Sequence, residues 1–192
     1  MDEQISVIND VNLDVVTETM SKINNFQKLL QRELKQGRDF GVIPSTTKPT
    51  LLKPGAEKIL MLLGISSEYE LIEQVQDYKQ GIFAFTIKCV LYKNGVKITE
   101  GVGCCSTKES KYAYKWVYEK EVPTTLNKED LVKREFNGPY GKYFKYRIDN
   151  DDPYTLANTV LKMAKKRAQV DAVLTVASLS EIFTQDMEDL QQ

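Results

Sequence analysis

Residues 82–102 read IFAFTIKCVLYKNGVKITEGV, and this stretch decides the fold. In its first half apolar side chains alternate with small or polar ones, which is the pattern of a strand with one buried face. The residues on that face are Phe83, Phe85, Ile87, Cys89 and Leu91. Asn94-Gly95 follows, and because both positions tolerate positive φ, the pair predicts a hairpin turn before a strand at 96–102. With the β-favouring run at 69–75, the stretch predicts an antiparallel meander of three or four strands.

Two helices are predicted before this meander. From Val11 to Leu34 apolar residues recur every three or four positions, which predicts a long amphipathic helix that ends at Gly37. Pro54 and Gly64 bound a second, shorter helix, because proline suits the first helical turn and glycine the C-terminal stop.

The most strongly helical segment follows the meander, from Tyr154 to about Val176. Its predicted core face carries Ala164, Ala168 and Ala172, and such small residues let a helix lie close against a sheet. The predicted fold class is therefore α+β, with N-terminal helices, a three- to four-stranded antiparallel β-meander and a long basic helix packed across one face.

Length and charge divide the chain into three parts. The 192 residues suit one domain. We expect an N-terminal helical segment (1–36), a single α+β nucleic-acid-binding domain (37–178) and an acidic C-terminal tail (179–192). Residues 1–21 and 176–192 contain acids but no base, so 26 bases against 18 acids give the part between them a net charge of +8. That charge fits a polyanionic ligand, and it also fits ordinary solvated helix faces.

The composition limits the cellular compartment and the kinds of chemical activity that we expect. No run approaches the roughly 18 to 20 apolar residues that span a bilayer, and the N-terminus has no signal-peptide pattern, so we expect a soluble, cytoplasmic protein without a membrane partner. Three cysteines and no histidine remove His-based catalytic dyads and the usual His-containing zinc sites. Walker A, G-x-G-x-x-G, G-x-S-x-G and HExxH patterns are also absent from the sequence. We therefore expect no catalytic residue, metal or cofactor, and no enzyme activity.

The long C-terminal helix concentrates positive charge. Opposite its alanines it carries Lys162, Lys165, Lys166 and Gln169, and Arg167 completes a basic cluster. Like charges at helical spacing repel by a few tenths of a kcal/mol per pair, and an array of phosphates would neutralise them. Arg167 has a carboxylate four residues on, at Asp171, as a predicted partner. The alternative is a solubilising stripe without a ligand.

Two runs, at 108–118 and 140–147, interleave aromatic and basic residues. Single-strand binding uses this composition, with cations for the backbone and rings that stack on bases. In the first run the candidates are the cations Lys108, Lys111 and Lys115 and the rings Tyr112, Tyr114 and Trp116. In a strand the three rings share one face, so the alternative is that they belong to the core.

Two further groups are expected to be structural. Asp149, Asp151 and Asp152 lack the glycine and the terminal glutamate of a calcium loop, so they predict a polar turn before the helix; the alternative is a metal-dependent nuclease. Cys104 and Cys105 are adjacent in a predicted strand and face opposite sides, so we expect small buried residues rather than a metal site.

Five motifs carry a resemblance to a known family. They are DFGVIP at 39–44, KPTLLKPGAEK at 48–58, STKESKY at 106–112, NTVLKMAKKRA at 158–168 and FTQD at 183–186. Together they resemble a family of phage and mobile-element proteins, which in turn is similar to the Rad-fifty-two/Erf/Sak superfamily of single-strand annealing recombinases. Some relatives carry a cysteine-rich, zinc-ribbon-like insertion before the basic helix. Residues 117–153 of this chain contain no cysteine, so the resemblance implies no zinc here.

The resemblance implies a recombination protein that binds single-stranded DNA, assembles into rings or filaments and anneals complementary strands without ATP. A groove would hold the strand, lined by Lys162, Lys165, Lys166 and Arg167 and by Lys108, Lys111 and Lys115, with Tyr112, Tyr114 and Trp116 as candidates for base stacking. An exonuclease or a single-strand binding protein, from host or phage, would be a further partner in the host cytoplasm. The alternative function is a protein-interaction module or an inhibitor of a host defence or repair complex, which uses the acidic ends.

Overall fold

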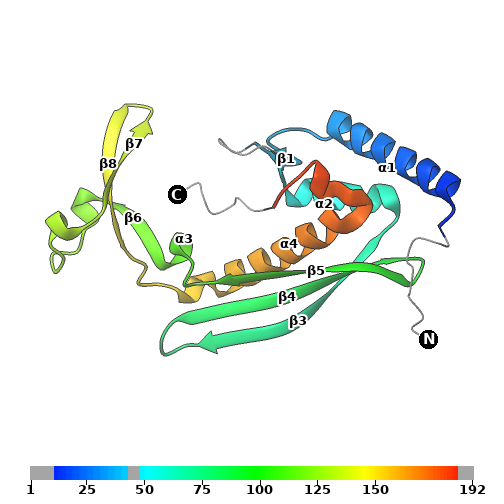
Figure 1. Cartoon of the computed structure of the whole chain (residues 1–192). Coiled ribbons are helices and arrows are strands. Elements are labelled where there is room, and N and C mark those ends of the chain that lie inside the picture. Colours follow the sequence, from blue (N-terminus) through cyan, green and yellow to red (C-terminus); the bar gives the residue numbers. More distant parts are fainter. Residues whose placement is uncertain (1–10, 43–47, 186–192) are drawn as a thin grey trace, which may run out of the picture.

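The computed structural model of the protein describes residues 11–42 and 48–185 (Figure 1). The α-helices are α1 (Leu13–Glu33), α2 (Lys53–Leu63), α3 (Ser110–Ala113) and α4 (Ala157–Thr175). The strands are β1 (Phe40–Gly41), β2 (Thr50–Leu51), β3 (Ser66–Asp77), β4 (Ile82–Lys93), β5 (Val96–Ser106), β6 (Tyr114–Tyr118), β7 (Lys133–Gly138) and β8 (Gly141–Asp149). Short 3-10 helices are η1 (Glu119–Glu121), η2 (Lys128–Asp130), η3 (Tyr154–Leu156) and η4 (Val176–Glu181).

The predicted meander is formed by β3, β4 and β5, which pair antiparallel in that order. Asn94 and Gly95 make the turn between β4 and β5, with φ angles of 53° and 77°, as their sequence predicts. The alternation in β4 is also confirmed, because the five residues of its apolar face are at most 6% exposed: Phe83, Phe85, Ile87, Cys89 and Leu91.

α4 lies across this apolar face, over β4 and β5 (Figure 1). Ala164, Ala168 and Ala172 are fully buried there. The helix approaches so closely that β5 has glycine at the points of contact: a Cβ on Gly101 would lie 2.2 Å from the backbone nitrogen of Ala172. The α+β class and the packing of the long basic helix across one face of the meander are therefore confirmed.

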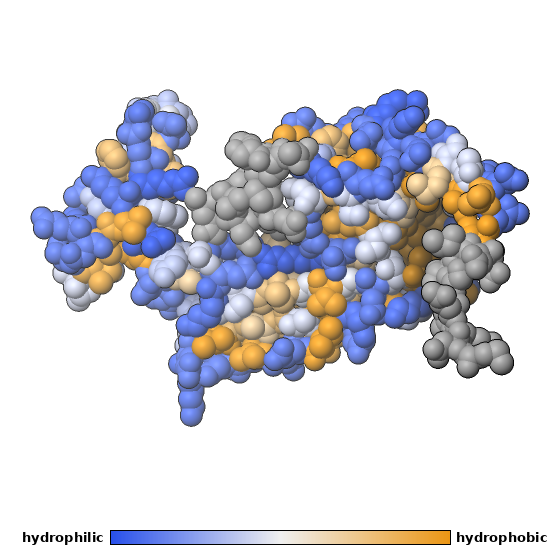
Figure 2. Space-filling view, in the orientation of Figure 1, coloured by the Kyte–Doolittle hydropathy of each residue, from blue (hydrophilic) through white to orange (hydrophobic). Residues whose placement is uncertain are grey.

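α1 begins at Asn12, whose side-chain oxygen accepts a hydrogen bond from the backbone N–H of Asp14. The helix is attached to the core by its C-terminal half. There Leu30 is buried, and the buried Gln27 side chain donates to the backbone oxygens of Ala177 and Ser178 in η4. The N-terminal half leaves apolar side chains exposed, and Figure 2 shows hydrophobic surface at that end of the helix. The exposed ones are Leu13, Val15, Val16 and Met20. The amphipathic helix is confirmed, but the residues at 11–42 and 48–185 cover only part of its apolar face.

Residues 37–42 and 48–53, which flank the undescribed segment 43–47, are organised by a buried carboxylate. Asp39 is fully buried, and its two oxygens lie 2.7 and 2.6 Å from the Lys58 ammonium. Burial raises the pKa of Asp39, but the hydrogen bonds from Lys58 and from the Lys35 backbone outweigh it, so the pKa lies below its ordinary value. Gly55 is required beside it, because a Cβ there would lie 2.2 Å from the Asp39 carbonyl oxygen. The sequence motifs at 39–44 and 48–58 are therefore in contact through Asp39, Lys58 and Gly55, and the contact is structural.

A second three-stranded sheet, in the order β6-β8-β7, projects from the body (Figure 1). We call residues 114–149 the wing. No second sheet is predicted from the sequence in this region, because β6 has only five residues and a loop with η1 and η2 separates it from β7. Among residues 11–42 and 48–185, no helix is both long and apolar enough to cross a membrane.

The described part of the predicted acidic tail belongs to the core. Leu179 and Phe183 are at most 2% exposed, and the Phe183 ring lies 6.0 Å from that of Phe40. Leu51 of β2 donates its backbone N–H to the Thr184 carbonyl oxygen. The chain thus packs back on itself as far as Gln185, and the acids at 186–189 lie outside the described residues.

Candidate nucleic-acid interface

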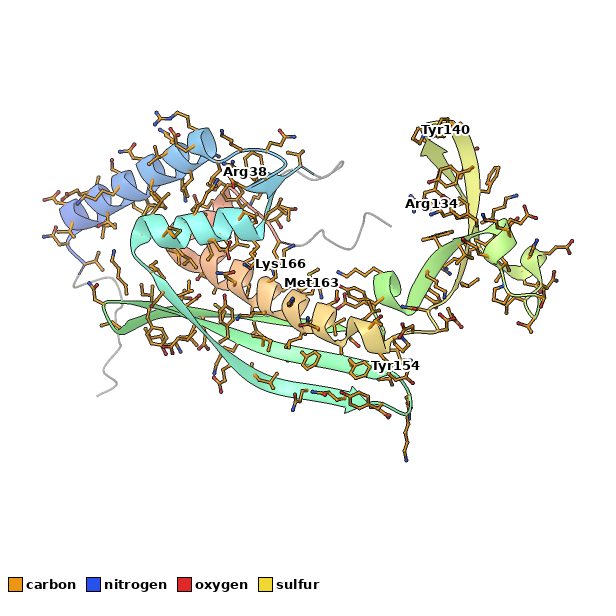
Figure 3. The ribbon with its side chains drawn as sticks, turned by 180° about the vertical axis from the view of Figure 1, so that it is seen from behind. Arg38, Arg134, Tyr140, Tyr154, Met163 and Lys166 are labelled. Carbon is orange, nitrogen blue, oxygen red and sulfur yellow. The ribbon has the colours of Figure 1, made fainter. Side chains whose placement is uncertain are left out.

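A groove lies beside α4, because this helix covers β4 and β5 and leaves the inner face of β3 open toward α2. The groove has a volume of about 700 Å³. We call it the α4 groove; Figure 3 marks two of its residues, Met163 and Lys166, on α4. Its lining residues are Lys53, Glu57, Ser67, Tyr69, Thr159, Lys162, Met163, Lys165, Lys166 and Gln169.

The groove is positively charged. Lys162, Lys165 and Lys166 of α4 all line it, so the structure brings together three of the predicted contacts. Glu57 is the only acid among the lining residues, and it pairs with Lys53 in the same helix, α2. The Lys165 ammonium lies 4.0 Å from the centre of the Tyr69 ring, a cation–π contact that fixes its position over β3. Three lysines held along one side of a groove suit a row of phosphates.

Gln169 adds an unusual polar group to the groove. The prediction that Gln169 lies on the exposed face of the helix is wrong, because the residue is only 4% exposed. Its side-chain oxygen, Oε1, has no hydrogen-bond partner among the described residues. An unsatisfied buried acceptor costs about 1–3 kcal/mol, and a donor brought by a ligand would recover part of that cost.

Arg167 faces the other side of α4. The predicted pairing with Asp171 is wrong: the Arg167 guanidinium donates to both carboxylate oxygens of Glu109, at 2.8 and 3.0 Å, and to the Cys104 carbonyl oxygen at 2.6 Å. Asp171 instead accepts from the Val102 backbone N–H. Burial raises the pKa of Glu109, but the Arg167 hydrogen bonds outweigh it and lower the pKa overall. We therefore assign Arg167 to the structure and not to the α4 groove.

The three predicted cations of the 108–118 run do not line the α4 groove. Lys108 lines a separate hollow of about 350 Å³ together with Tyr112 and Asn150. Lys111 lies 3.5 Å from Glu109 and 5.0 Å from the centre of the Tyr112 ring. Lys115 pairs with Asp151, whose pKa is lowered by that contact. The single groove expected from the resemblance is therefore lined by the α4 lysines but not by these three.

The three candidate rings also separate. Tyr112 belongs to α3 rather than to a strand, and it is 9% exposed beside Cys105. Burial raises its pKa, and its ring is a core residue, so base stacking on Tyr112 is excluded. Tyr114 and Trp116 do share one face, in β6 of the wing.

The acids lie at the predicted turn, but the expectation that Cys104 and Cys105 are both buried is wrong for Cys104. Asp149 to Asp152 lie at the end of β8 and in the turn that follows. In the part of the chain that the structure describes, no three His, Cys, Asp or Glu side chains are grouped to hold a metal ion. Cys105 is buried and Cys104 is exposed, which confirms that they face opposite sides of β5. Burial raises the pKa of the Cys105 thiol to about 12.

Sequence reasoning missed Lys53 and Tyr69 as groove residues. Lys53 comes directly before Pro54 at the start of α2. From the sequence one can predict only that the Lys53 side chain lies near a helix end. Tyr69 belongs to the inner face of β3, and the alternation of that strand was a usable signal. Nothing in the sequence showed that β3 and α4 leave a gap between them.

The comparisons with known proteins add no assignment: no protein-family model matches the chain, and neither curated proteins nor solved structures give a significant match.

Proposed function

We propose that this protein binds single-stranded DNA in the α4 groove and anneals complementary strands without ATP, as a homo-oligomer in the cytoplasm. The observation that supports the proposal most directly is the row of lysines, Lys162, Lys165 and Lys166, along one wall of a groove that contains a single, already paired acid. The groove supplies positive charge for a nucleic-acid backbone. Annealing does not require the catalytic groups that hydrolysis needs.

Annealing suits a groove of this kind. No bond is made or broken, so the protein only has to hold the backbone of one strand while its bases stay open to a second strand. Lysine is a point charge on a flexible stem, and it binds phosphate without selecting a sequence.

The proposed homo-oligomer rests on α1. Leu13, Val16 and Met20 lie on the same helix face as Gln27 and Leu30, which are buried in the core. Leu13, Val16 and Met20 are 71%, 40% and 49% exposed, so the N-terminal part of this apolar stripe is left uncovered by the described residues. A second copy is the occupant we propose, because a strand-annealing protein must hold more nucleotides than one groove of this size covers. An exonuclease or single-strand binding protein would then contact the assembled protein.

The test combines binding and annealing. Fluorescence anisotropy with a single-stranded and a duplex oligonucleotide should show single-strand preference and a dependence on salt with a log-log slope of about −0.7 per phosphate contacted. Two complementary strands that carry a donor and an acceptor dye should anneal faster with the protein and without ATP. Equal affinity for duplex and single strand, or no acceleration, would contradict the proposal.

A protein-interaction module or inhibitor remains the second candidate, and one observation favours it. The outer face of the meander carries the exposed acids Glu68, Glu70, Glu73 and Glu100. Such a face could take the place of nucleic acid on a basic partner. In that case the protein would fail to bind oligonucleotides and would instead displace them from a host DNA-binding complex, so the same anisotropy assay separates the two functions.

A further inference from the structure

Rings and cations predominate on one face of the wing, and the acid Asp149 lies opposite Tyr114 at the end of that face. Strand register places β6, β8 and β7 side chains together: Trp116 is opposite Arg147, Tyr118 is opposite Lys145, and Lys145 is opposite Arg134. Two residues further along these strands, Phe136 is opposite Tyr143. We call this set the aromatic face, and its members are Tyr114, Trp116, Tyr118, Arg134, Phe136, Tyr143, Lys145 and Arg147.

The rings of the aromatic face form one connected layer. The Trp116 and Phe136 ring centres are 5.6 Å apart at 71°, and those of Phe136 and Tyr143 are 5.8 Å apart at 17°. The cations lie over the rings: Arg147 is 4.5 Å from the centre of the Tyr114 ring and Lys145 is 4.7 Å from that of Tyr118. Rings held in this way lose little freedom when a further planar group stacks on them.

This face is not the core of the wing. The buried residues of the wing lie on the opposite face and in the loop that covers it: Tyr146 and Ile148 are each 7% exposed and Val122 is 8% exposed. On the aromatic face, by contrast, Tyr114 and Tyr118 are 39% and 42% exposed. The opposite face is the more deeply packed one around Tyr146 and Ile148, although Phe144 at its far end is 46% exposed. On the aromatic face Tyr114 and Tyr118 are therefore exposed to a ligand, and Trp116, Phe136 and Tyr143 are half-buried beside them.

The aromatic face contains a hollow, and Arg134 lies on the side of the wing that is turned toward the body. Tyr114, Trp116, Arg134 and Arg147 line a hollow of about 190 Å³ with Lys111 at its edge. Figure 3 shows Arg134 on the side of the wing that is turned toward the rest of the molecule. In Figure 2 the side of the wing in view is mostly hydrophilic surface with separate hydrophobic patches. Rings between guanidinium and ammonium groups match a ligand that is both planar and anionic.

We propose that the aromatic face stacks on unpaired bases of a single-stranded nucleic acid, as a second site that is separate from the α4 groove. Tyr114, Trp116, Tyr118 and Tyr143 would contact base planes, while Arg134 and Lys145 would contact the neighbouring phosphates. Bases inside a duplex cannot reach these rings, so the site selects single strands. This inference rests on the proposed function for the identity of the ligand. In it the α4 groove binds the phosphates of the strand and the aromatic face binds its bases.

Trp116 makes the site directly observable, because it is the only tryptophan of the chain. An oligothymidine of about 15 nucleotides should quench its fluorescence by stacking, whereas an abasic strand of the same length should bind the α4 groove through its phosphates without quenching. Tyr118→Ala should weaken binding of oligothymidine about 5- to 150-fold, the range for loss of one stacked base. Tyr118→Phe keeps the ring and should keep binding. Tyr140→Ala is the matched control, since Tyr140 is fully exposed in the turn between β7 and β8.

The outcomes separate the two proposals. Binding of oligothymidine without quenching, or equal quenching by the abasic strand or by polyglutamate, would overturn the aromatic-face site and leave the α4 groove standing. Quenching that persists in the Lys162→Glu/Lys165→Glu/Lys166→Glu variant would support the site even if annealing fails. If Tyr118→Ala loses the far-ultraviolet circular dichroism of the wild type, the comparison of quenching by oligothymidine and by the abasic strand in the wild-type protein decides the case. Wild-type affinity for Tyr118→Ala in a folded protein would contradict the site.

Discussion

Gly103 of β5 lies directly against Ala168 of α4, and a Cβ on Gly103 would come within 2.3 Å of the Ala168 backbone nitrogen. The neighbouring Gly101 stands in the same relation to Ala172, at 2.2 Å. Helix and strand therefore meet backbone to backbone, and the position of the α4 lysines relative to β3 depends on this approach. A larger residue on either side would move the wall of the groove.

Gly103→Ala should consequently destabilise the fold by about 1–3 kcal/mol or more, because overpacking of a close contact forces the backbone apart. Urea unfolding measures the loss. Gly41→Ala is the matched control: nothing lies within 4 Å of a Cβ built there, and its φ does not require glycine. Equal stability of Gly103→Ala and Gly41→Ala would contradict the packing described for β5 and α4.

The ion pair between Arg167 and Glu109 should contribute to stability rather than to DNA binding. Its side chains are only 17% and 25% exposed, so Arg167→Ala should cost about 1.5–3 kcal/mol, the range for hydrogen bonds to charged groups. Oligonucleotide affinity, measured at a temperature at which the variant is folded, should stay near that of the wild type. A loss of affinity at full stability would return Arg167 to the binding residues.

The same pair predicts a pH dependence. The folded pKa of Glu109 is below its ordinary value of 4.5, so its contribution to the free energy of unfolding is complete above pH 4.5 and is lost as the pH falls through the lowered value. The stability difference between wild type and Glu109→Gln should therefore shrink on acidification from neutral pH to below 4.5. Urea titrations of both proteins at several pH values measure it, and a constant difference would speak against a charged pair.

α1 should carry the contact between copies. Replacing Leu13, Val16 and Met20 by serine should lower the oligomer mass in mass photometry without lowering the melting temperature of the body, since these side chains are exposed in the single chain. The control Val15→Ser/Leu29→Ser removes two exposed apolar residues that lie away from the stripe. If both variants assemble like the wild type, α1 does not hold the copies together.

The acidic end of the chain should weaken DNA binding. The Gln185 side chain donates to the Arg167 backbone oxygen on α4 at 2.8 Å, so the acids at 186, 188 and 189 follow directly on a residue that contacts the basic helix. Removing residues 186–192 should raise affinity for single strands about two- to tenfold at low salt, and the gain should vanish at high salt. A cut before Phe183 is unsuitable, because that ring is buried in the core.

The sequence was informative wherever one local pattern determines the outcome. Asn94-Gly95 predicted the turn, the alternation from Phe83 to Leu91 predicted the buried face of β4, and the alanines of α4 predicted its close packing. It was less informative where long-range pairing decides. The partner of Arg167 lies at Glu109, 58 residues away, and the local candidate Asp171 was preferred in error. The wing escaped detection for the same reason, because the face shared by Trp116 and Arg147 exists only once β6 and β8 pair.

The decisive prediction concerns the α4 groove itself. Changing Lys162, Lys165 and Lys166 together to glutamate should abolish annealing and strongly weaken single-strand binding. The three positions lie away from the buried alanines. Lys162 and Lys165 are exposed and Lys166 is half-buried, so the variant should stay folded, with a melting temperature somewhat below that of the wild type. The log-log salt slope of any remaining binding should be about 2 smaller, because three phosphate contacts of about 0.7 each are lost.

A charge-matched control makes this test specific. Lys28, Lys79 and Lys93 are exposed on α1, on the β3–β4 turn and at the end of β4, and none lines the α4 groove. Their replacement by glutamate changes the net charge by the same six units, so it reproduces the long-range electrostatic effect without touching the groove. Because local contacts to phosphate release counterions and distant charges only steer, the groove variant should lose binding while the control loses chiefly association rate at low salt. If the two variants weaken binding equally, net charge rather than the α4 groove holds the strand, and if neither does, the lysines of α4 are a solvated face.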